Sequence, residues 1–340
     1  MGRIRVIQVG AGRFGQSWLQ TLKEYPDTDI AAVVDVLPDN LEAAESMLGS
    51  DGTKYSVNIE ETLHNTNADL VLIVTPPSTH TDIAIQALEQ GFHVMMEKPL
   101  AHSYEEAVHL LEASKRYDRK IAVSQNYRWR QPIQTLKKVI EEGIIGKIGY
   151  IEYDFRKPKK LGGWRDQYSD VMLEDMSIHH FDIMRFLLGR EVVEVSAQSF
   201  RPEWSWFTGN PTASVSLLFE DNIFVNYFAC WVSRGKETTW NGDIRIAGEY
   251  GAIELINDQV HVRIFDEDIE KEYRSIDLVE TPFPELSFRD RGSSLNDMVN
   301  AIRENREPNT SLVDNFKSFE ITCVAIKSSK KHGEKIVIGK

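Results

Sequence analysis

The chain has 340 residues, of which 41% are hydrophobic and 27% charged, and its formal net charge is −13 at pH 7. This length suits two domains or one large one, and the composition excludes disordered, collagen-like and coiled-coil chains. The acidic balance argues against a nucleic-acid partner, because no concentrated basic face stands against it.

Cysteine usage and apolar runs indicate the cellular setting. The two cysteines, Cys230 and Cys323, are far apart and form no disulfide framework, which suits a reducing compartment. No apolar run approaches the roughly 18 residues of a membrane span. The first apolar run is short and enters a glycine-rich segment, unlike a signal peptide. We therefore expect a soluble, cytoplasmic protein with no membrane partner.

The first 125 residues alternate short apolar runs with amphipathic stretches. The apolar runs are rich in Val and Ile and lack a polar face, as expected for strands that are covered on both sides. They are Ile4–Val9, Ile30–Val34, Leu70–Val74, His93–Met96 and Ile121–Ser124. One of the stretches between them, Thr79–Gln90, predicts a helix that ends at Gly91. The alternation predicts parallel βαβ units, and hence a doubly wound Rossmann domain over residues 1–125.

After about residue 146 the chain changes to closely spaced apolar segments joined mostly by short turns. The predicted strands are Gly149–Arg156, Val192–Phe200, Ala213–Phe219, Ile223–Ala229, Asp243–Ala247, Ala252–Ile256 and Val260–Phe265. Several alternate apolar and polar residues, which is typical of an antiparallel sheet with one packed face. Helices are expected over 294–305 and 313–330. Residues 126–340 therefore predict an α+β domain with a large, mainly antiparallel open sheet.

A glycine-rich segment, GAGRFG, follows the first strand and opens a helix. Its residues are Gly10, Ala11, Gly12, Arg13, Phe14 and Gly15. Glycines permit a tight turn and a close backbone approach, and the helix N-terminus offers unpaired N–H groups to a pyrophosphate. This arrangement predicts a dinucleotide site, against the alternative of a structural glycine turn.

The second strand ends at Asp35, twenty residues past Gly15, where a carboxylate is expected to meet the adenosine ribose hydroxyls. A 2′-phosphate beside this carboxylate would bring like charges together, so NAD is expected rather than NADP. Arg13 is able to reach a phosphate, which leaves NADP open.

Lys98 lies at the carboxyl end of the strand His93–Met96, within the sequence Glu97-Lys98-Pro99. Open α/β sheets bind their ligands at that edge. A lysine there could hydrogen-bond a substrate hydroxyl and stabilise the developing alkoxide. On position alone, a solvent-facing loop lysine remains the alternative.

The segment Met172–Leu188 is apolar enough for a core helix, yet Asp175, His179 and Asp182 fall on one stripe of it. Asp175 lies one turn before His179 and is placed to orient the imidazole. A structural polar cluster is the alternative. No metal is expected, because no further cluster completes a coordination shell. His180 points about 100° away, as a packing or substrate-edge residue.

Two short segments carry side chains suited to a sugar ring. Tyr127 and Arg128 follow the last Rossmann strand, and Trp164 and Arg165 lie on a loop before the Asp–His helix. Aromatic rings stack on sugars and guanidinium groups bind their hydroxyls. Packing at the domain interface is the alternative for each pair.

The motifs GAGRFG, VVD, TPPSTH and EKPLA, in this order, resemble the Gfo/Idh/MocA oxidoreductase family over most of the chain. The resemblance implies that Lys98 contacts substrate and cofactor and that its bond to Pro99 is cis. It further implies positions near the nicotinamide ribose or the domain junction for Thr75, Pro76, Pro77, His80, Glu97 and Asn126. It makes Asp175 and His179 the catalytic pair, with Ser177 replacing the usual glycine of DxGxHxxD.

Taken together, these features predict an NAD(P)-dependent dehydrogenase or reductase that acts on a CH–OH group of a sugar, polyol or sugar derivative. A glycoside hydrolase that uses NAD, and a dinucleotide-sensing regulatory protein, are the alternatives. The resemblance also implies a homodimer or homotetramer. We expect its contact on the outer sheet face, assigned here to Val225, Tyr227 and Trp231.

Overall fold

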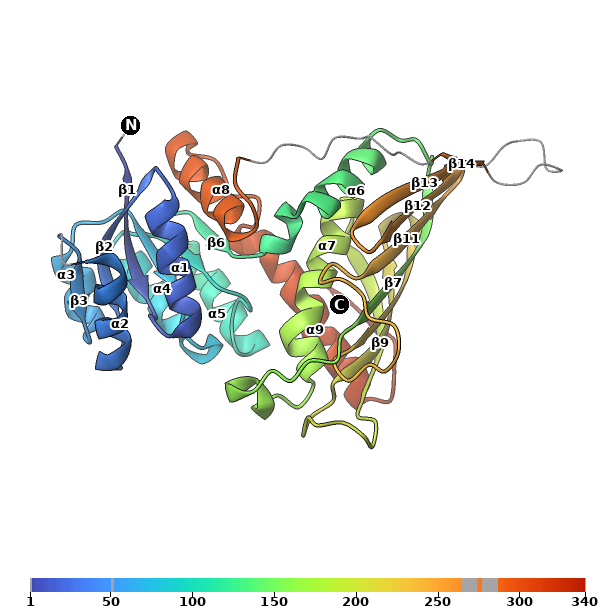
Figure 1. The fold of residues 1–340 in the computed structure, drawn as a ribbon, viewed down its shortest axis with the longest axis horizontal. Helices are drawn as coiled ribbons and strands as arrows, with labels where there is room; N and C mark the ends of the chain where they lie inside the picture. The colour runs from blue at the N-terminus through green and yellow to red at the C-terminus, as the bar shows by residue number, and fades with distance from the viewer. Residues whose placement is uncertain (1, 50–51, 265–273, 277–286, 340) are drawn as a thin grey trace. The chain divides into compact units, whose positions relative to one another are not determined.

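The computed structural model describes residues 2–49, 52–264, 274–276 and 287–339. The chain divides into two compact units, each built from two stretches of sequence (Figure 1). Unit 1 comprises Met1–Asn126 and Phe288–Phe316, and unit 2 comprises Tyr127–Ser287 and Lys317–Lys340. Among the described residues, none of the helices combines the length and hydropathy that crossing a bilayer requires.

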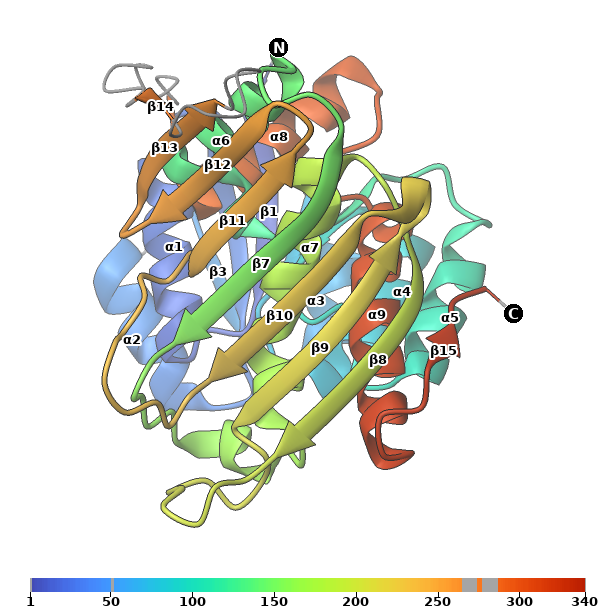
Figure 2. The ribbon, with the colours of Figure 1, turned by 90° about the vertical axis from the view of Figure 1, so that its right-hand side faces the viewer.

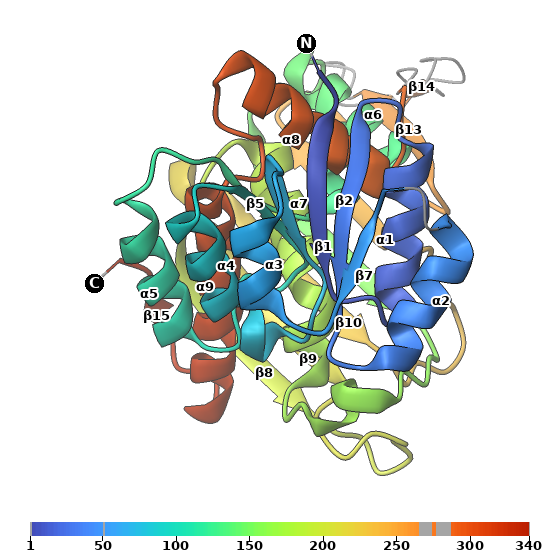
Figure 3. The same ribbon diagram turned by 90° about the vertical axis from the view of Figure 1, so that its left-hand side faces the viewer.

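Unit 1 is built on a parallel sheet with the strand order β3-β2-β1-β4-β5-β6 (Figure 3). Its strands are β1 (Ile4–Val9), β2 (Thr28–Val34), β3 (Lys54–Ser56), β4 (Leu70–Ile73), β5 (His93–Met96) and β6 (Ile121–Val123). The order reverses between β1 and β4, as in a doubly wound Rossmann sheet. The predicted fold of the first domain is confirmed.

The helices of unit 1 begin where the sequence supplies capping groups. Asn58 and Ser103 each accept a hydrogen bond from the backbone N–H three residues on, and Pro38 occupies a first helical position. The helices are α1 (Arg13–Glu24), α2 (Pro38–Leu48), α3 (Ile59–Asn65), α4 (His80–Glu89), α5 (Tyr104–Ser114) and α8 (Arg291–Glu304), with a short turn η1 (Pro77–Thr79).

Helix α8 belongs to unit 1 although it lies near the end of the chain. Its buried residues Leu295, Met298 and Val299 follow helical spacing and join the core that includes Trp18 and Met95. The predicted division at residue 125 therefore differs from the structure, which assigns Phe288–Phe316 to unit 1. Sequence proximity alone carried no sign of this return.

Unit 2 is built on a sheet with the order β14-β13-β12-β11-β7-β10-β9-β8-β15, seen face-on in Figure 2. Neighbours are antiparallel except β7 and β10, which are parallel. The strands are β7 (Ile148–Arg156), β8 (Val192–Phe200), β9 (Thr212–Phe219), β10 (Phe224–Cys230), β11 (Asp243–Gly248), β12 (Gly251–Ile256), β13 (Gln259–Ile264), β14 (Arg274–Ile276) and β15 (Ile336–Val337). Phe265, at the end of a predicted strand, lies outside the described residues.

Helical segments supply the core on one face of this sheet. They are α6 (Gln131–Glu141), η4 (Met172–Ser177), α7 (Ile178–Leu188) and the part of α9 (Leu312–Lys330) that falls in unit 2. Three further short turns are η2 (Asn126–Trp129), η3 (Gly163–Gln167) and η5 (Glu220–Asn222).

The assignment of Val225, Tyr227 and Trp231 to the outer face of the sheet is wrong. All three are at most 1% exposed and belong to the core beneath the helices. On β10 it is Phe224 that faces out, at 47% exposed. Because side chains alternate along a strand, a shift of one residue exchanges its two faces.

Candidate active site

The loops that follow β1 and β4 meet at the point where the strand order of unit 1 reverses. Gly10 has a φ of +98°, and a Cβ there would lie 2.6 Å from the carbonyl oxygen of Val74. A Cβ on Gly15 would lie 2.2 Å from the carbonyl oxygen of Gly10. Backbone contact at both positions leaves room only for glycine, which is what a phosphate-binding turn of this type needs.

The N-terminus of α1 is open toward an anion. Gly12 precedes the helix, and a Cβ on it would meet nothing closer than Asn40 Nδ2 at 3.8 Å. No side chain caps this end, and its first turn carries no acid. Arg13 and Phe14 are exposed there. Free N–H groups and the positive end of the helix dipole therefore fit the pyrophosphate of a dinucleotide.

Asp35 lies directly after β2 and is tied to the glycine loop. Its Oδ2 accepts the Ala11 N–H at 2.7 Å, and its Oδ1 accepts the Leu37 N–H at 2.9 Å and Asn40 Nδ2 at 3.1 Å. The next two residues, Val36 and Leu37, are apolar and exposed. A 2′-phosphate at this place would meet a fixed carboxylate, so the local charge favours NAD.

His80 crosslinks the two loops that carry the TPPSTH and EKPLA motifs. Its Nδ1 lies 2.9 Å from the carbonyl oxygen of Pro99 and its Nε2 lies 3.0 Å from that of Thr75. The ring is fully buried, and burial lowers the pKa of His80. Both ring nitrogens are taken up by protein carbonyls, and the position of His80 near the nicotinamide ribose stays a prediction. Pro76 is exposed and Pro77 buried in the same loop.

The Lys98–Pro99 peptide bond is cis, as the resemblance implied. Glu97 is 7% exposed, and its carboxylate accepts Trp18 Nε1 at 2.7 Å and the Lys98 N–H at 3.2 Å. Burial, foremost, raises the pKa of Glu97. The carboxylate thus ties the Lys98 loop to α1. Trp18 was missed from the sequence, where it is one apolar residue of an amphipathic helix.

Asn126 Nδ2 lies 3.5 Å from Asp290 Oδ1, at the residue before α8. The next residue, Arg291, holds its guanidinium 4.9 Å from the ring centroid of Phe14 and donates to Ser17 Oγ at 2.6 Å. A basic group from the far end of the sequence therefore lies over the first turns of α1. Arg291 is far from α1 along the chain, so the sequence did not predict this contact.

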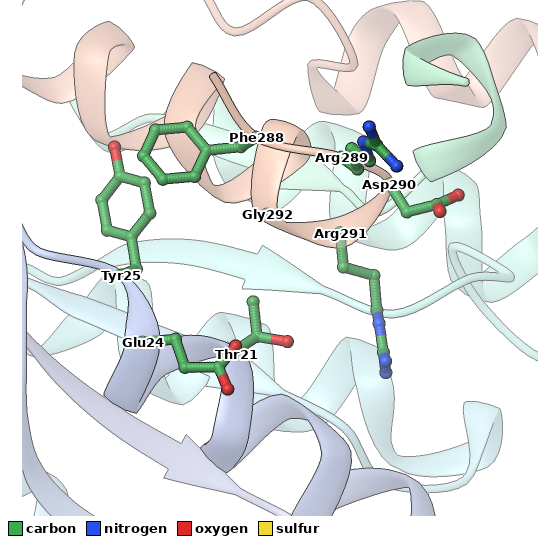
Figure 4. Close-up of a pocket in the computed structure, with 8 residues that line it drawn as sticks. All are labelled: Thr21, Glu24, Tyr25, Phe288, Arg289, Asp290, Arg291 and Gly292. Atoms are coloured by element: carbon green, nitrogen blue, oxygen red, sulfur yellow. The ribbon is translucent and has the colours of Figure 1, made fainter. Parts of the chain in front are cut away.

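A cavity of about 240 Å³ lies between α1 and the start of α8 (Figure 4). Its walls are Thr21, Glu24, Tyr25, Phe288, Arg289, Asp290, Arg291 and Gly292. Thr21 and Tyr25 belong to the C-terminal half of α1 and to its end, away from the glycine loop. The cavity is therefore distinct from the pyrophosphate cradle.

In unit 2, the predicted helix Met172–Leu188 begins with a wider turn. The segment η4 is a π-helix, and Ser177 Oγ donates to the carbonyl of Met172, five residues back, at 2.9 Å. Such turns are frequent at functional sites. Asp175 lies within η4, is 6% exposed, and accepts Arg165 Nε at 2.9 Å. The pairing of two predicted residues, one from η3 and one from η4, supports a shared local role.

His179 lies in the first turn of α7 and is 5% exposed. Its ring stacks on Tyr127, with centroids 4.2 Å apart and planes at 9°. The Arg130 guanidinium lies 3.3 Å from the same tyrosine centroid. Since both partners are that close, they occupy opposite faces of the tyrosine ring. Arg130 was not among the predicted residues.

Arg128 does not have the substrate-facing position expected of it. Its Nε and Nη2 each donate to the carboxylate of Asp182 at 2.6 Å, and Ser318 Oγ donates to the same carboxylate at 2.8 Å. The two charged side chains are 6% and 1% exposed. Asp182 thus anchors α7, as expected, and Arg128 is its structural partner.

His180 is a packing residue and not a substrate contact. It is fully buried, its Nδ1 lies 2.8 Å from the Tyr227 hydroxyl, and Tyr153 and Phe155 pack against its ring. Burial, foremost, lowers the pKa of His180 to about 3. The backbone places Trp164 in η3, and its expected role stays a prediction. The described residues hold no group of three or more His, Cys, Asp or Glu arranged to bind a metal.

A Rossmann unit with an open glycine cradle, joined to a unit that buries an acid beside a stacked histidine, defines a two-domain oxidoreductase of the dinucleotide-binding class. Residues 4–125 match the family described as an oxidoreductase family with an NAD-binding Rossmann fold, Gfo/Idh/MocA, and residues 133–254 match its C-terminal domain. The chain belongs to the Gfo/Idh/MocA family of oxidoreductases, and its first unit is the NAD-binding domain.

Named relatives and solved structures agree with this placement. Myo-inositol 2-dehydrogenase of Thermotoga maritima is 30% identical over 57% of this chain and 58% of its own length, so the chain spans under two thirds of that relative. An Agrobacterium radiobacter oxidoreductase in complex with NAD+, L-tartaric acid and magnesium has a TM-score of 0.87, with 22% identity and 99% of each chain covered. Levoglucosan dehydrogenase in complex with NADH and levoglucosan has a TM-score of 0.83, with 22% identity over 99% of this chain and all of the other.

Proposed function

We propose that the protein is an NAD-dependent dehydrogenase or reductase that acts on a CH–OH group of a sugar, a polyol or a sugar derivative. The observation that carries the proposal is the pair Asp175 and His179, both nearly buried and one helical turn apart. A buried titratable pair of this kind needs a reason beyond packing. A relative and a structural neighbour named for cyclic polyhydroxylated compounds, inositol and levoglucosan, support the substrate class.

The proposed roles follow from the chemistry of each side chain. In the oxidative direction His179 accepts the proton of the substrate hydroxyl. Asp175 stabilises the imidazolium that results, and Arg165 holds the Asp175 carboxylate. Lys98 donates a hydrogen bond to the same hydroxyl and lowers its pKa. When bound, NAD supplies the hydride acceptor.

The residues that hold NAD come from the loops of the Rossmann sheet. Gly10, Gly12 and Gly15 form the pyrophosphate cradle, with Arg13 and Phe14 at its rim. Asp35 binds the adenosine ribose. Thr75, Pro76 and Pro77 line the nicotinamide ribose, and Glu97, with His80 behind it, keeps the Lys98 loop in place. Asn126 contributes at the end of unit 1.

The substrate ring is proposed to lie against the Tyr127, Trp164 and Arg165 segments. His179 and Arg130 cover the two faces of the Tyr127 ring, so Tyr127 serves to position His179, and Arg165 offers a guanidinium beside Asp175. One hydroxyl is thereby placed at the histidine while neighbouring hydroxyls find donors and acceptors.

We further propose a homodimer or homotetramer formed through the outer face of the unit 2 sheet. Tyr150 and Phe224 are direct neighbours on β7 and β10 and are 52% and 47% exposed. Paired exposed aromatics on an open sheet favour contact with another subunit. Light scattering that returns the mass of one chain would contradict this.

The decisive experiment follows reduced nicotinamide by absorbance with purified protein, NAD or NADP, and a panel of inositols, aldoses, glycosides and sugar derivatives. Turnover with NAD on a panel member establishes the dehydrogenase. Cleavage of a glycoside without net NADH identifies the hydrolase instead. NADH binding with no turnover on any member, repeated with the reverse reaction, favours the regulatory protein.

A further inference from the structure

One end of the unit 2 sheet gathers loops from four strands. In the strand register Cys230, at the end of β10, lies opposite Arg156, at the end of β7, and opposite Thr212, at the start of β9. Thr212 in turn lies opposite Phe200, at the end of β8. The loops that follow β7, β8 and β10 therefore leave the sheet at the same end of its strands, along the lower rim in Figure 2.

These loops carry three exposed tryptophans, which we call the tryptophan patch (Trp204, Trp206 and Trp240). They are 54%, 40% and 38% exposed, whereas Trp18 and Trp231 are at most 1% exposed. Large aromatic side chains left in water at one place mark a binding surface more often than a free one.

Each tryptophan of the patch has a cation near its ring. Arg234 lies 5.2 Å from the Trp204 centroid and Lys160 lies 5.8 Å from that of Trp206. Lys157 and Lys159 each lie 5.6 Å from the Trp240 centroid. The positive groups thus stand beside the aromatic faces, within the range of cation–π attraction.

The loops at this end of the sheet carry a net positive charge, whereas the protein as a whole is negatively charged. Residues 156–160, 200–212 and 230–243 hold seven Lys or Arg against three acids, in a chain of net charge −13. Across the described residues Lys159, Lys160 and Arg234 form no salt bridge. Cations that the chain leaves unneutralised are available to an anion.

The patch is held by the backbone and is not a set of loose side chains. Trp206 Nε1 donates to the Lys159 carbonyl at 3.3 Å, and the Lys159 N–H donates to the Trp231 carbonyl at 3.0 Å. Trp204 Nε1 donates to the Val232 carbonyl at 3.4 Å. Rings fixed in this way lose little freedom when a ligand binds.

The same loops connect to the proposed catalytic segment of unit 2. Asn210 N–H donates to the Ser169 carbonyl at 2.8 Å, and the Met172 N–H donates to the Asn210 carbonyl at 3.3 Å, at the start of η4. Arg165, five residues after Lys160, pairs with Asp175. The patch and the Asp175 segment therefore belong to one tied set of loops.

We propose that the tryptophan patch binds an anionic sugar, a pyranose-sized ring that carries a carboxylate or a phosphate. The indole faces stack on the C–H faces of the ring, and Lys159, Lys160 and Arg234 bind its charge. This deepens the proposed function, on which it rests, by naming the substrate class: the enzyme takes a substrate with an anionic portion remote from the reacting hydroxyl.

Binding is tested first without cofactor, by isothermal titration calorimetry of the whole protein with D-glucuronate, D-glucose 6-phosphate and neutral D-glucose. The anionic probes bind at least about tenfold more tightly than glucose, and added salt weakens them. The double variant Lys159→Gln/Lys160→Gln loses that preference. Lys138→Gln, an exposed lysine of α6, keeps it. Equal affinities for glucose and glucuronate would overturn the proposal.

The aromatic part is tested with Trp204→Ala and Trp206→Ala, matched to Tyr250→Ala, an exposed aromatic outside the patch. The tryptophan variants raise KM for an anionic substrate about tenfold with kcat kept, as loss of uniform binding requires. Anionic binding with no turnover on any substrate supports the patch and rejects the dehydrogenase. If the variants instead lower the mass by light scattering and leave probe binding intact, the patch contacts a second copy and the proposal fails.

Discussion

The ring of Tyr127 lies parallel to that of His179, with 4.2 Å between the centroids, and Arg130 closes its other face. The plane of the proposed base is therefore set within unit 2 by an aromatic neighbour and a cation. An imidazole held this way keeps its orientation whether or not substrate is present, which reduces the reorganisation that proton transfer requires.

Tyr127 is expected to act as a positioning residue for His179. Tyr127→Leu removes the stacking surface and lowers kcat about tenfold or more, with the Kd for NADH unchanged. Tyr127→Phe keeps the ring and is the matched control, with kcat near that of the wild type. A Leu variant with normal kcat contradicts the role.

His179 and Lys98 carry the proton chemistry in the proposed mechanism. His179→Ala and Lys98→Ala should each reduce turnover by on the order of 10²-fold or more, while each variant still folds and unfolds cooperatively in urea. His102→Ala, at an exposed position, serves as the control. Near-normal turnover of either variant removes that residue from the catalytic set.

We expect Asp35 to determine the preference for NAD over NADP. Asp35→Asn removes the negative charge and leaves one acceptor oxygen where the carboxylate has two, so NADPH binding improves relative to NADH by about tenfold. Fluorescence titration with both reduced cofactors measures the ratio. Asp39→Asn, an acid of the first turn of α2, is the control and leaves the ratio unchanged.

The Arg128–Asp182 pair is buried, and breaking it leaves a charge without compensation. Arg128→Ala should lower the free energy of unfolding by about 3–5 kcal/mol. The exposed pair Arg190–Asp221 provides the comparison, since Arg190→Ala should leave the free energy of unfolding almost unchanged. Urea titrations of both variants test this, and equal effects would falsify the structural role of Arg128.

His180 makes the protein sensitive to acid. Its folded-state pKa of about 3 lies below the value near 6.5 of an unfolded histidine, so the unfolded chain binds the proton more readily. Stability is therefore lost as pH falls below about 6.5, by up to about 1.4 kcal/mol for each pH unit. His180→Gln flattens that limb of the stability–pH curve measured by urea titration. An unchanged slope in this variant contradicts the assignment.

Local signals in the sequence predicted individual strands and the glycine loop more accurately than they predicted long-range packing. The strand His93–Met96 and the glycine loop were placed correctly because short apolar runs and obligatory glycines are properties of the chain itself. The sequence does not show what the His80 ring contacts. Only the fold brings the carbonyl groups of Thr75 and Pro99 to its two nitrogens. The structural role of His80 follows from these two contacts, which its residue type alone does not reveal.

Two other misassignments have a different origin. The two faces of β10 were exchanged in the prediction. Phe224 and Val225 are both apolar, so the pattern did not show which of them faces the core. Arg128 was assigned to the substrate because guanidinium groups suit sugars, yet Asp182, fifty-four residues later, binds it inside the core. The helix α8 itself was predicted, over 294–305, but its place in unit 1 and the contact of Arg291 with Phe14 were not, because no local pattern near residue 290 indicates a contact with α1.

The return of α8 to unit 1 bears on how the protein is made. A ribosome releases the glycine cradle, the five crossovers of the parallel sheet and the Lys98 loop long before it reaches Leu295, Met298 and Val299, which complete the same apolar core. Until α8 has been made, the nascent NAD domain exposes the apolar surface that α8 covers in the folded protein. Synthesis of the cofactor domain therefore ends only after most of unit 2 has been made, and a fragment cut at residue 125 is expected to aggregate where residues 1–340 fold.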